Sequence, residues 1–377
     1  MRILLVTPLF PSPRSPMIGA DRYALVENLR KEGHDVTVIT INGKHESRIE
    51  HKVHRVPSMT VPQIDYHVPN VLSLLNLVKR IGAEFDVHHY YQQEFLTIVP
   101  SFFIDSPVKV LTVDNFPGLD WFYDNYIVDA VARFESLTLG QEALTRFDGI
   151  IFLSKMSMRT ALKLKPSLKR TVWIPHGVYT ERLKPDEEAG ERTRNSLGLH
   201  RIVVGFVGRL VPVKGISYLA AAIKKLDNEG FSADFLIVGD GPERKRLENL
   251  QLSNSRVSLV GYRAHPAEFI QAADYLVLPS LGEGCPNAVL EALACGKPVI
   301  ASKVGGVPDL IEHEKTGWLV NPRDVEGLAE GIKALASDAK RLRLMGKEAR
   351  KFAETALDWR VVTRQILEFY STLINCD

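Results

Sequence analysis

The chain has 377 residues, of which 45% are hydrophobic and 24% are charged, a balance that excludes an intrinsically disordered protein. Its 47 basic and 45 acidic residues leave a formal net charge of +2, which gives no indication of nucleic-acid binding. No apolar run approaches the ~18 residues of a membrane-spanning helix, and the three cysteines show no CxxC spacing. We therefore expect a reduced, cytoplasmic protein of two or three domains, at roughly 150 residues per domain.

Short apolar runs rich in β-branched residues alternate with longer helical patterns in the first half of the chain. Most runs are apolar at consecutive positions, as expected of strands that are covered on both faces of a parallel sheet. Helical patterns lie near 20–32, 70–81, 124–146 and 155–164. The expected strands are Ile3–Thr7, Val36–Ile41, Val53–Val56, Val87–His89, Val108–Val113, Ile150–Leu153 and Val172–Ile174.

The same alternation restarts after a polar stretch, Glu181–Arg201, which we interpret as a linker or an excursion of the chain. The later strands are expected at Ile202–Val207, Phe235–Val238, Val257–Val260, Tyr275–Leu278, Val299–Ala301 and Trp318–Val320. Two such series predict an α/β fold with two doubly wound parallel-sheet domains, 1–177 and 178–357, facing each other across a cleft. A last helix is expected within 358–377, folding back on the first domain.

The most informative segment is 278–300, which reads as strand, Gly/Pro loop, helix and strand. Glu283 lies in the loop, and Pro286 or Asn287 begins a helix that places Glu291 in its first or second turn. The free backbone N–H groups at 284–288 suit a phosphate, and carboxylates suit sugar hydroxyls. A diphosphate bracketed by two sugar rings would match this loop. Taken alone, the two glutamates could equally be a loop carboxylate and a helix-start charge.

This segment resembles the signature of retaining glycosyltransferase family four, the glycosyl transferases of group 1. The two glutamates of that signature, seven residues apart, match Glu283 and Glu291, and the resemblance continues through 304–308 and 316–320. It implies the GT-B fold of two Rossmann-like domains and retention at the anomeric carbon. It also implies that Glu291 binds ribose hydroxyls and Glu283 the transferred sugar. The donor-binding set around the helix start is then Gly284, Cys285, Pro286, Asn287 and Glu291.

A second candidate segment, 205–215, follows the first strand of the second half. Gly208 allows close backbone approach, and Arg209 and Lys214 supply two cations that suit a leaving diphosphate. An arginine and a lysine at the matching positions hold the distal phosphate in similar family members. We therefore predict Arg209, Lys214 and Glu283 as catalytic residues; two solvated basic side chains are the alternative. No Asp-x-Asp motif is present, so we expect neither a metal nor another cofactor.

The first half carries weaker signals. Gly19 matches one of two glycines that the family often carries near the donor phosphate or the acceptor, although a plain flexible loop explains it as well. Asp114 stands where the family commonly has a histidine against the transferred sugar, so it is either a sugar contact or a cap of the following loop. His88 and His89 could line the cleft or be structural.

A basic stretch without acidic residues follows the sixth expected strand. Such a face could meet anionic lipid head groups at the inner membrane surface, although a solvated helix face is the ordinary explanation. Its members are Lys155, Arg159, Lys163, Lys165, Lys169 and Arg170.

Together these features predict a metal-independent hexosyltransferase that uses a nucleotide-diphosphate sugar, with a glycan, a lipid-linked glycan or a small molecule as acceptor. A nucleotide-sugar 2-epimerase of the same fold is one alternative, although no convincing acid and base groups for that reaction are evident. A non-catalytic nucleotide-sugar-binding protein is the other, and the substitution at Asp114 is its main support.

Overall fold

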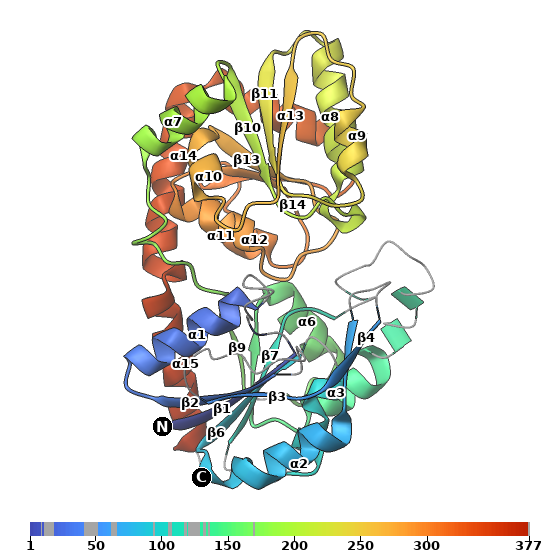
Figure 1. The fold of residues 1–377 in the computed structure, drawn as a ribbon, viewed down its shortest axis with the longest axis vertical. Helices are drawn as coiled ribbons and strands as arrows, with labels where there is room; N and C mark the ends of the chain where they lie inside the picture. The colour runs from blue at the N-terminus through green and yellow to red at the C-terminus, as the bar shows by residue number, and fades with distance from the viewer. Residues whose placement is uncertain are drawn as a thin grey trace. The chain divides into compact units, whose positions relative to one another are not determined.

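The computed structural model describes residues 1–8, 10, 19–40, 52–61, 66–92, 95–104, 108–116, 119, 129–130, 133–134, 136–168 and 170–375. The chain divides into two compact units (Figure 1). The first comprises the described residues of 1–119, 130–177 and 359–375, and the continuous part of the second is Val178–Asp358.

The first unit is built on a seven-stranded parallel sheet in the order β3-β2-β1-β6-β7-β8-β9. Because β1 and β6 are neighbours, the chain reverses its direction of winding between them, and ligands bind at the carboxyl ends of strands at such a point. Ile3, Leu4, Leu5 and Val6 are fully buried, as their consecutive apolar pattern predicts. The strands are β1 (Arg2–Thr7), β2 (Asp35–Thr40), β3 (Val53–Arg55), β6 (Val87–Gln92), β7 (Lys109–Val113), β8 (Gly149–Phe152) and β9 (Thr171–Trp173).

Helices cover this sheet, and the C-terminal helix is one of them. Tyr370 of that helix is fully buried and hydrogen-bonds with His89 of β6. A two-stranded hairpin of β4 (Ser58–Val61) and β5 (Tyr66–Pro69) stands apart from the main sheet. The helices of this unit are α1 (Ala20–Lys31), α2 (Val71–Ile81), η1 (Gly82–Glu84), α3 (Phe95–Ile98), η2 (Val99–Phe102), η3 (Ser136–Gly140), α5 (Gln141–Leu144), α6 (Lys155–Leu164) and α15 (Trp359–Ile374).

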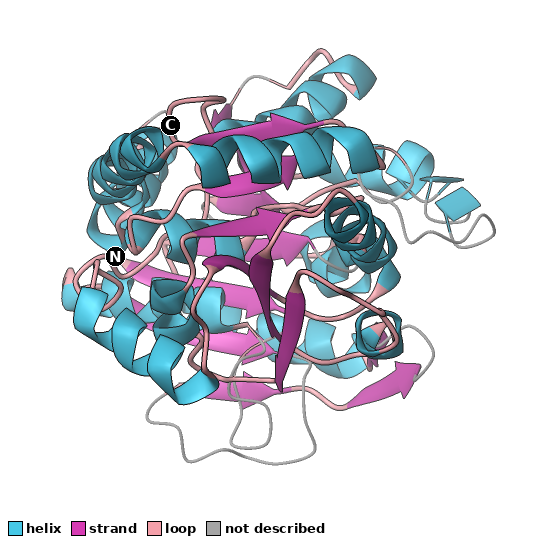
Figure 2. Cartoon of the chain, turned by 90° about the horizontal axis from the view of Figure 1, so that it is seen from above, coloured by secondary structure: helices cyan, strands magenta, loops and turns pink. Residues whose placement is uncertain are grey.

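The second unit repeats the plan with six parallel strands in the order β12-β11-β10-β13-β14-β15, and its winding reverses between β10 and β13. Helices flank the strands, as Figure 2 shows in cyan and magenta. The strands are β10 (Ile202–Val207), β11 (Ala233–Val238), β12 (Arg256–Gly261), β13 (Tyr275–Leu278), β14 (Val299–Ser302) and β15 (Gly317–Val320). The helices are α7 (Glu187–Leu197), η4 (Pro212–Lys214), α8 (Ile216–Asn228), α9 (Arg244–Glu248), α10 (Ala267–Ala272), α11 (Asn287–Ala294), α12 (Val307–Leu310), α13 (Val325–Ser337), α14 (Ala339–Phe352) and η5 (Ala353–Leu357).

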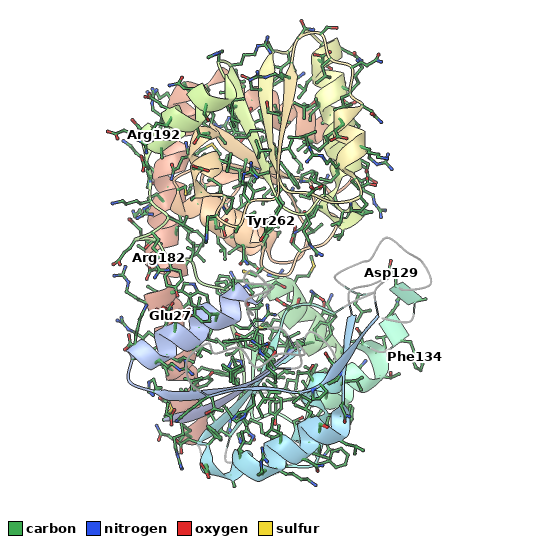
Figure 3. All side chains as sticks on the ribbon, in the orientation of Figure 1. Glu27, Asp129, Phe134, Arg182, Arg192 and Tyr262 are labelled. Atoms are coloured by element: carbon green, nitrogen blue, oxygen red, sulfur yellow. The ribbon has the colours of Figure 1, made fainter. Side chains whose placement is uncertain are left out.

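The linker predicted over Glu181–Arg201 is wrong for its central part, which forms α7. The Asp186 side chain accepts a hydrogen bond from the Ala189 N–H at 2.9 Å, and Gly198 closes the helix at φ +60°. Charged residues dominate this helix because only one side packs. Its Gly190 lies against the backbone of α10, while Arg192 lies at the outer surface (Figure 3).

The helix predicted over 124–146 is only partly within the described residues. Its described end consists of a π-helical turn, η3, followed by α5, which ends at Leu144. Among all helices of the described residues, none combines the length and apolar character needed to cross a membrane.

Candidate active site

Four loops meet at the carboxyl edge of the second sheet. They follow β10, β11, β13 and β14, the four central strands on either side of the reversal point. The loop after β13 is tied to the loop after β10 by a hydrogen bond from the Leu281 N–H to the Val213 carbonyl at 2.8 Å. It is tied to the loop after β14 by a bond from the Gly306 N–H to the Gly284 carbonyl at 3.0 Å. The edge is therefore a single connected structure.

Glycines make this close packing possible. A Cβ on Gly305, which has φ +50°, would lie 1.5 Å from the carbonyl oxygen of Glu283. A Cβ on Gly215, which has φ +68°, would lie 1.9 Å from the carbonyl oxygen of Pro279. No side chain fits at either distance, so these glycines fix where the loop of Glu283 lies.

The structure brings two predicted catalytic residues, 69 positions apart in the chain, into direct contact. The Nζ of Lys214, at the end of η4, lies 2.6 Å from the Oε1 of Glu283. The Ser280 hydroxyl donates to the same oxygen at 2.6 Å. Glu283 is buried, with 7% of its side chain exposed against 19% for Lys214. A cation and a carboxylate are thus held together where the sheet opens to ligands.

The helix start predicted near residue 287 is confirmed. Pro286 is the non-helical residue before α11, at φ −72° and ψ 112°, and no side chain caps the helix. The N–H groups of Asn287 and Ala288 therefore lie at an uncapped helix N-terminus, which favours an anion. Glu291 lies one turn into α11, where burial raises the pKa of its carboxyl to about 7.

Arg209 and Gly208 occupy the turn after β10. A Cβ on the neighbouring Gly239 would lie 1.8 Å from the Gly208 carbonyl, so the two turns pack backbone to backbone. The Arg209 side chain is exposed and, within the described chain, forms no hydrogen bond or ion pair. Cys285 is half-buried and packs against the core of this unit.

The carboxyl edge of the first sheet is different, because it holds a buried charged cluster of Asp21, Arg22, Asp114 and His176. Arg22 Nη1 lies 2.9 Å from Asp21 Oδ1, and its Nη2 lies 3.4 Å from Asp114 Oδ2. His176 Nε2 lies 3.2 Å from Asp21 Oδ2. The cluster begins next to Gly19, which precedes α1 in the left-handed conformation at φ +71°. Arg22 was missed by sequence reasoning; its place directly after the loop that follows β1 was the available signal.

His88 and His89 have structural roles within β6, and both side chains are fully buried. His88 Nε2 hydrogen-bonds to the Gly82 carbonyl at 2.8 Å. His89 hydrogen-bonds to the hydroxyls of Tyr370 and Thr112 at 2.5 and 2.6 Å. Burial lowers the pKa of His89 to about 3, so its imidazole is neutral.

The basic residues on and after α6 are not one uniform surface. Lys155 lies over the Trp173 ring at 4.2 Å, and Lys165 lies 3.9 Å from a Glu142 carboxylate oxygen. Arg159, Lys163 and Arg170 are exposed, and Lys169 lies outside the described residues.

Two protein-family models match the chain. The model described as Glycosyltransferase Family 4 matches residues 22–182, and the model described as Glycosyl transferases group 1 matches residues 201–338. Together they span most of both units. This chain is a group 1 glycosyltransferase of family 4. It is therefore a hexosyltransferase enzyme, and the predicted family is confirmed.

Relatives of this glycosyltransferase support the same assignment. The capsular polysaccharide biosynthesis glycosyltransferase CapM of Staphylococcus aureus is 22% identical over 362 residues, which is 93% of each chain. A GDP-mannose-dependent α-(1-6)-phosphatidylinositol monomannoside mannosyltransferase of Mycolicibacterium smegmatis is 33% identical over 258 residues, covering 64% of this chain and 65% of that relative.

The fold has solved counterparts. The structure of sucrose-phosphate synthase from Thermosynechococcus elongatus superimposes with a TM-score of 0.80 at 24% identity and covers 100% of both chains. This likeness, together with the two parallel sheets, confirms the predicted GT-B class of two Rossmann-like domains.

Proposed function

We propose that this enzyme transfers a hexosyl group from a nucleoside diphosphate sugar to a glycan or lipid-linked acceptor, with retention at the anomeric carbon and without a metal ion. The name of the mycobacterial relative specifies a GDP-mannose donor and a phosphatidylinositol mannoside acceptor, and CapM acts in capsular polysaccharide biosynthesis. These names support the class of donor and acceptor, while the base, the sugar and the acceptor of this chain stay open.

The contact of Lys214 with Glu283, beside the N-terminus of α11, is the observation that carries the proposal. In this arrangement Lys214 and the exposed Arg209 neutralise the diphosphate as it leaves. The uncapped N–H groups of Asn287 and Ala288 add donors to the same anion. One well-placed donor to developing charge contributes roughly 10²–10³-fold in rate.

The carboxylates take the hydroxyl-bearing parts of the donor. Glu283 accepts hydrogen bonds from the transferred sugar, and Glu291 from the ribose. The bond from the anomeric carbon to the β-phosphate oxygen breaks, and the diphosphate leaves with the electron pair. The acceptor oxygen bonds to the same face of that carbon, and its proton passes to the departing phosphate. The two cations, Lys214 and Arg209, supply the charge that a divalent metal would otherwise provide.

A lipid-linked acceptor gives the exposed basic side chains Arg159, Lys163 and Arg170 a role, since they suit anionic head groups. Sedimentation with phosphatidylglycerol vesicles, compared with phosphatidylcholine vesicles, tests this contact. The wild type should bind the anionic vesicles, and charge reversal of all three residues should abolish that binding. Equal binding of the wild type to both lipids would contradict membrane contact through these residues.

A thermal-shift panel of UDP-, GDP- and ADP-sugars, followed by product analysis, tests the proposed function. A donor at 100 times its dissociation constant should stabilise the protein by about 2.7 kcal/mol. The anomeric coupling of the product should match that of the donor, and EDTA should leave the rate unchanged. An altered nucleotide sugar would instead indicate an epimerase, and donor binding without release of nucleoside diphosphate would indicate a binding protein.

A further inference from the structure

The charged cluster at the carboxyl edge of the first sheet has a geometry that the assigned donor residues do not explain. Arg22 is only 6% exposed, and its two terminal nitrogens contact two different carboxylates, Asp21 and Asp114. Its guanidinium also lies 5.0 Å above the ring of Tyr91, which in turn stacks on His89. Arg22 is therefore held in one orientation from several sides.

Burying charges in this way costs free energy, which hydrophobic residues of the same size would avoid. Burial alone would raise the pKa of Asp21, but Arg22 and His176 hold that pKa below its ordinary value. Burial likewise opposes the charge of Arg22, and Asp21 and Asp114 nevertheless raise its pKa. The cluster thus keeps charged groups at this edge, although replacing buried ion pairs by hydrophobic residues of similar volume is often neutral or stabilising.

The two carboxylates differ in exposure. The Asp114 side chain is 18% exposed and the Asp21 side chain 8%. Asp114 is therefore the more accessible of the two carboxylates, whereas Asp21 pairs with both Arg22 and His176. A planar guanidinium can hold both carboxylates with separate nitrogens, which the single ammonium of a lysine cannot do with the same directionality.

We propose that Arg22 is a positioning residue that holds Asp114 as the hydrogen-bond acceptor for a hydroxyl group of the sugar substrate. The inference rests on the proposed function and adds a selectivity to it. The ligand-facing group of the cluster is the carboxylate of Asp114, held by the guanidinium of Arg22. A uronic acid, which places a carboxylate where a hexose has a hydroxymethyl group, is then disfavoured at this site.

Kinetics of four variants and one control test the positioning role, with the donor that the thermal-shift panel identifies. Arg22→Met and Asp114→Asn should each lower kcat/KM at least tenfold, and Arg22→Lys should recover part of the loss. Because Arg22 acts through Asp114, the kcat/KM of the double variant, Arg22→Met with Asp114→Asn, should lie within twofold of the value for Asp114→Asn alone. Arg30→Met is the matched control, since Arg30 lies on the same helix but donates to the Val36 carbonyl at 2.7 Å. Losses that multiply in the double variant, or equal losses in Arg22→Met and Arg30→Met, would overturn the positioning role.

Two assays locate the hydroxyl. If it belongs to the transferred sugar, Asp114→Asn slows hydrolysis of the donor in the absence of acceptor as much as it slows transfer. If it belongs to the acceptor, hydrolysis is unchanged and the KM for the acceptor rises. A wild-type enzyme that uses the uronic acid form of the sugar as well as the neutral form would contradict the selectivity.

The stability of the same variants separates this inference from the proposed function. Absence of turnover with every donor would refute the proposed function and, with it, the sugar contact. The positioning contact is then decided by thermal unfolding of the two single variants and the double variant. A coupling between Arg22 and Asp114 supports it, and strictly additive changes in Tm refute it.

Discussion

The two parallel sheets follow the same winding plan, but different kinds of groups lie at their carboxyl edges. At the edge of the second sheet, Gly215 and Gly305 pack on neighbouring carbonyls, a helix N-terminus is left uncapped, and Lys214 pairs with Glu283. The edge of the first sheet is made of charged side chains, with Arg22 between two carboxylates. Backbone N–H groups and fixed cations suit phosphate, whereas carboxylates suit hydroxyls. This difference favours phosphate binding at the edge of the second sheet and hydroxyl binding at the edge of the first.

Removal of the Lys214 amine should have the largest effect on the second edge. Lys214→Ala should lower kcat roughly 10²–10³-fold, because on the proposed function the leaving diphosphate loses one of its two cations. It also leaves the buried Glu283, among the described residues, with the Ser280 hydroxyl as its remaining side-chain partner, so Tm should be measured alongside.

Lys224→Ala is the control for this change, because Lys224 lies on α8 and donates to the Gln251 carbonyl. Its rate should stay within twofold of wild type. A similar loss in both variants would mean that Lys214 acts only through stability.

A methyl group at Gly305 should disturb the second edge without removing any functional group. Gly305→Ala places a Cβ 1.5 Å from the Glu283 carbonyl, so that loop must move, and donor affinity should fall at least tenfold. Gly230→Ala is the matched control, because Gly230 also has a positive φ, +80°, but has no atom within 4 Å of the added Cβ. Donor titration of both variants should show a loss in the first only.

The carboxyl of Glu291 should make stability depend on pH. The pKa of this carboxyl is about 7 in the folded protein, above the ordinary value of 4.5. Its contribution to the free energy of unfolding is therefore full below pH 4.5 and is lost as pH rises through 7. Glu291→Gln should therefore be more stable than wild type at pH 8, by up to about 3 kcal/mol, and should lose most of this advantage at pH 5.

Chemical unfolding at both pH values measures this difference. Glu330→Gln, an exposed change on α13, should show no such dependence on pH. If the free energy of unfolding of Glu291→Gln changed with pH in the same way as that of the wild type, Glu291 would not be desolvated.

The smallest effect is expected beneath the first edge, where the buried histidines are structural. Tyr370→Phe removes the hydroxyl that contacts His89 at 2.5 Å and should cost about 1–2 kcal/mol of unfolding free energy. The kinetic constants should not change. Tyr262→Phe, at a residue that is 60% exposed, should change neither property, and a kinetic defect in Tyr370→Phe would place His89 in the active site after all.

Local sequence patterns were sufficient for the sheets and for the second edge. Consecutive apolar residues placed β10 and β13 at their observed bounds, and α6 was placed as well, because these patterns depend on burial on both faces or on helical periodicity. The helix start after Pro286 followed from local backbone rules, and it predicted where Glu291 would lie.

Features that depend on tertiary contacts were not predictable from local patterns, although the family resemblance had placed Lys214 and Glu283 in one catalytic set. Helix α7 looked like a linker because its buried side consists of small residues such as Gly190, which packs on the α10 backbone. The contact of Lys214 with Glu283 spans 69 residues, and the placement of Arg22 beside Asp114 spans 92. No local pattern encodes such pairs. The basic stretch after Ser154 looked uniform, although Lys155 lies on the Trp173 ring.

Calorimetric titration of nucleotides most directly tests the claim that the second edge is a diphosphate site. The nucleoside diphosphate of the preferred donor should bind at least tenfold more tightly than its monophosphate, and Lys214→Ala should remove most of that difference. Equal affinities for the two nucleotides, or an unchanged ratio in the variant, would contradict the account.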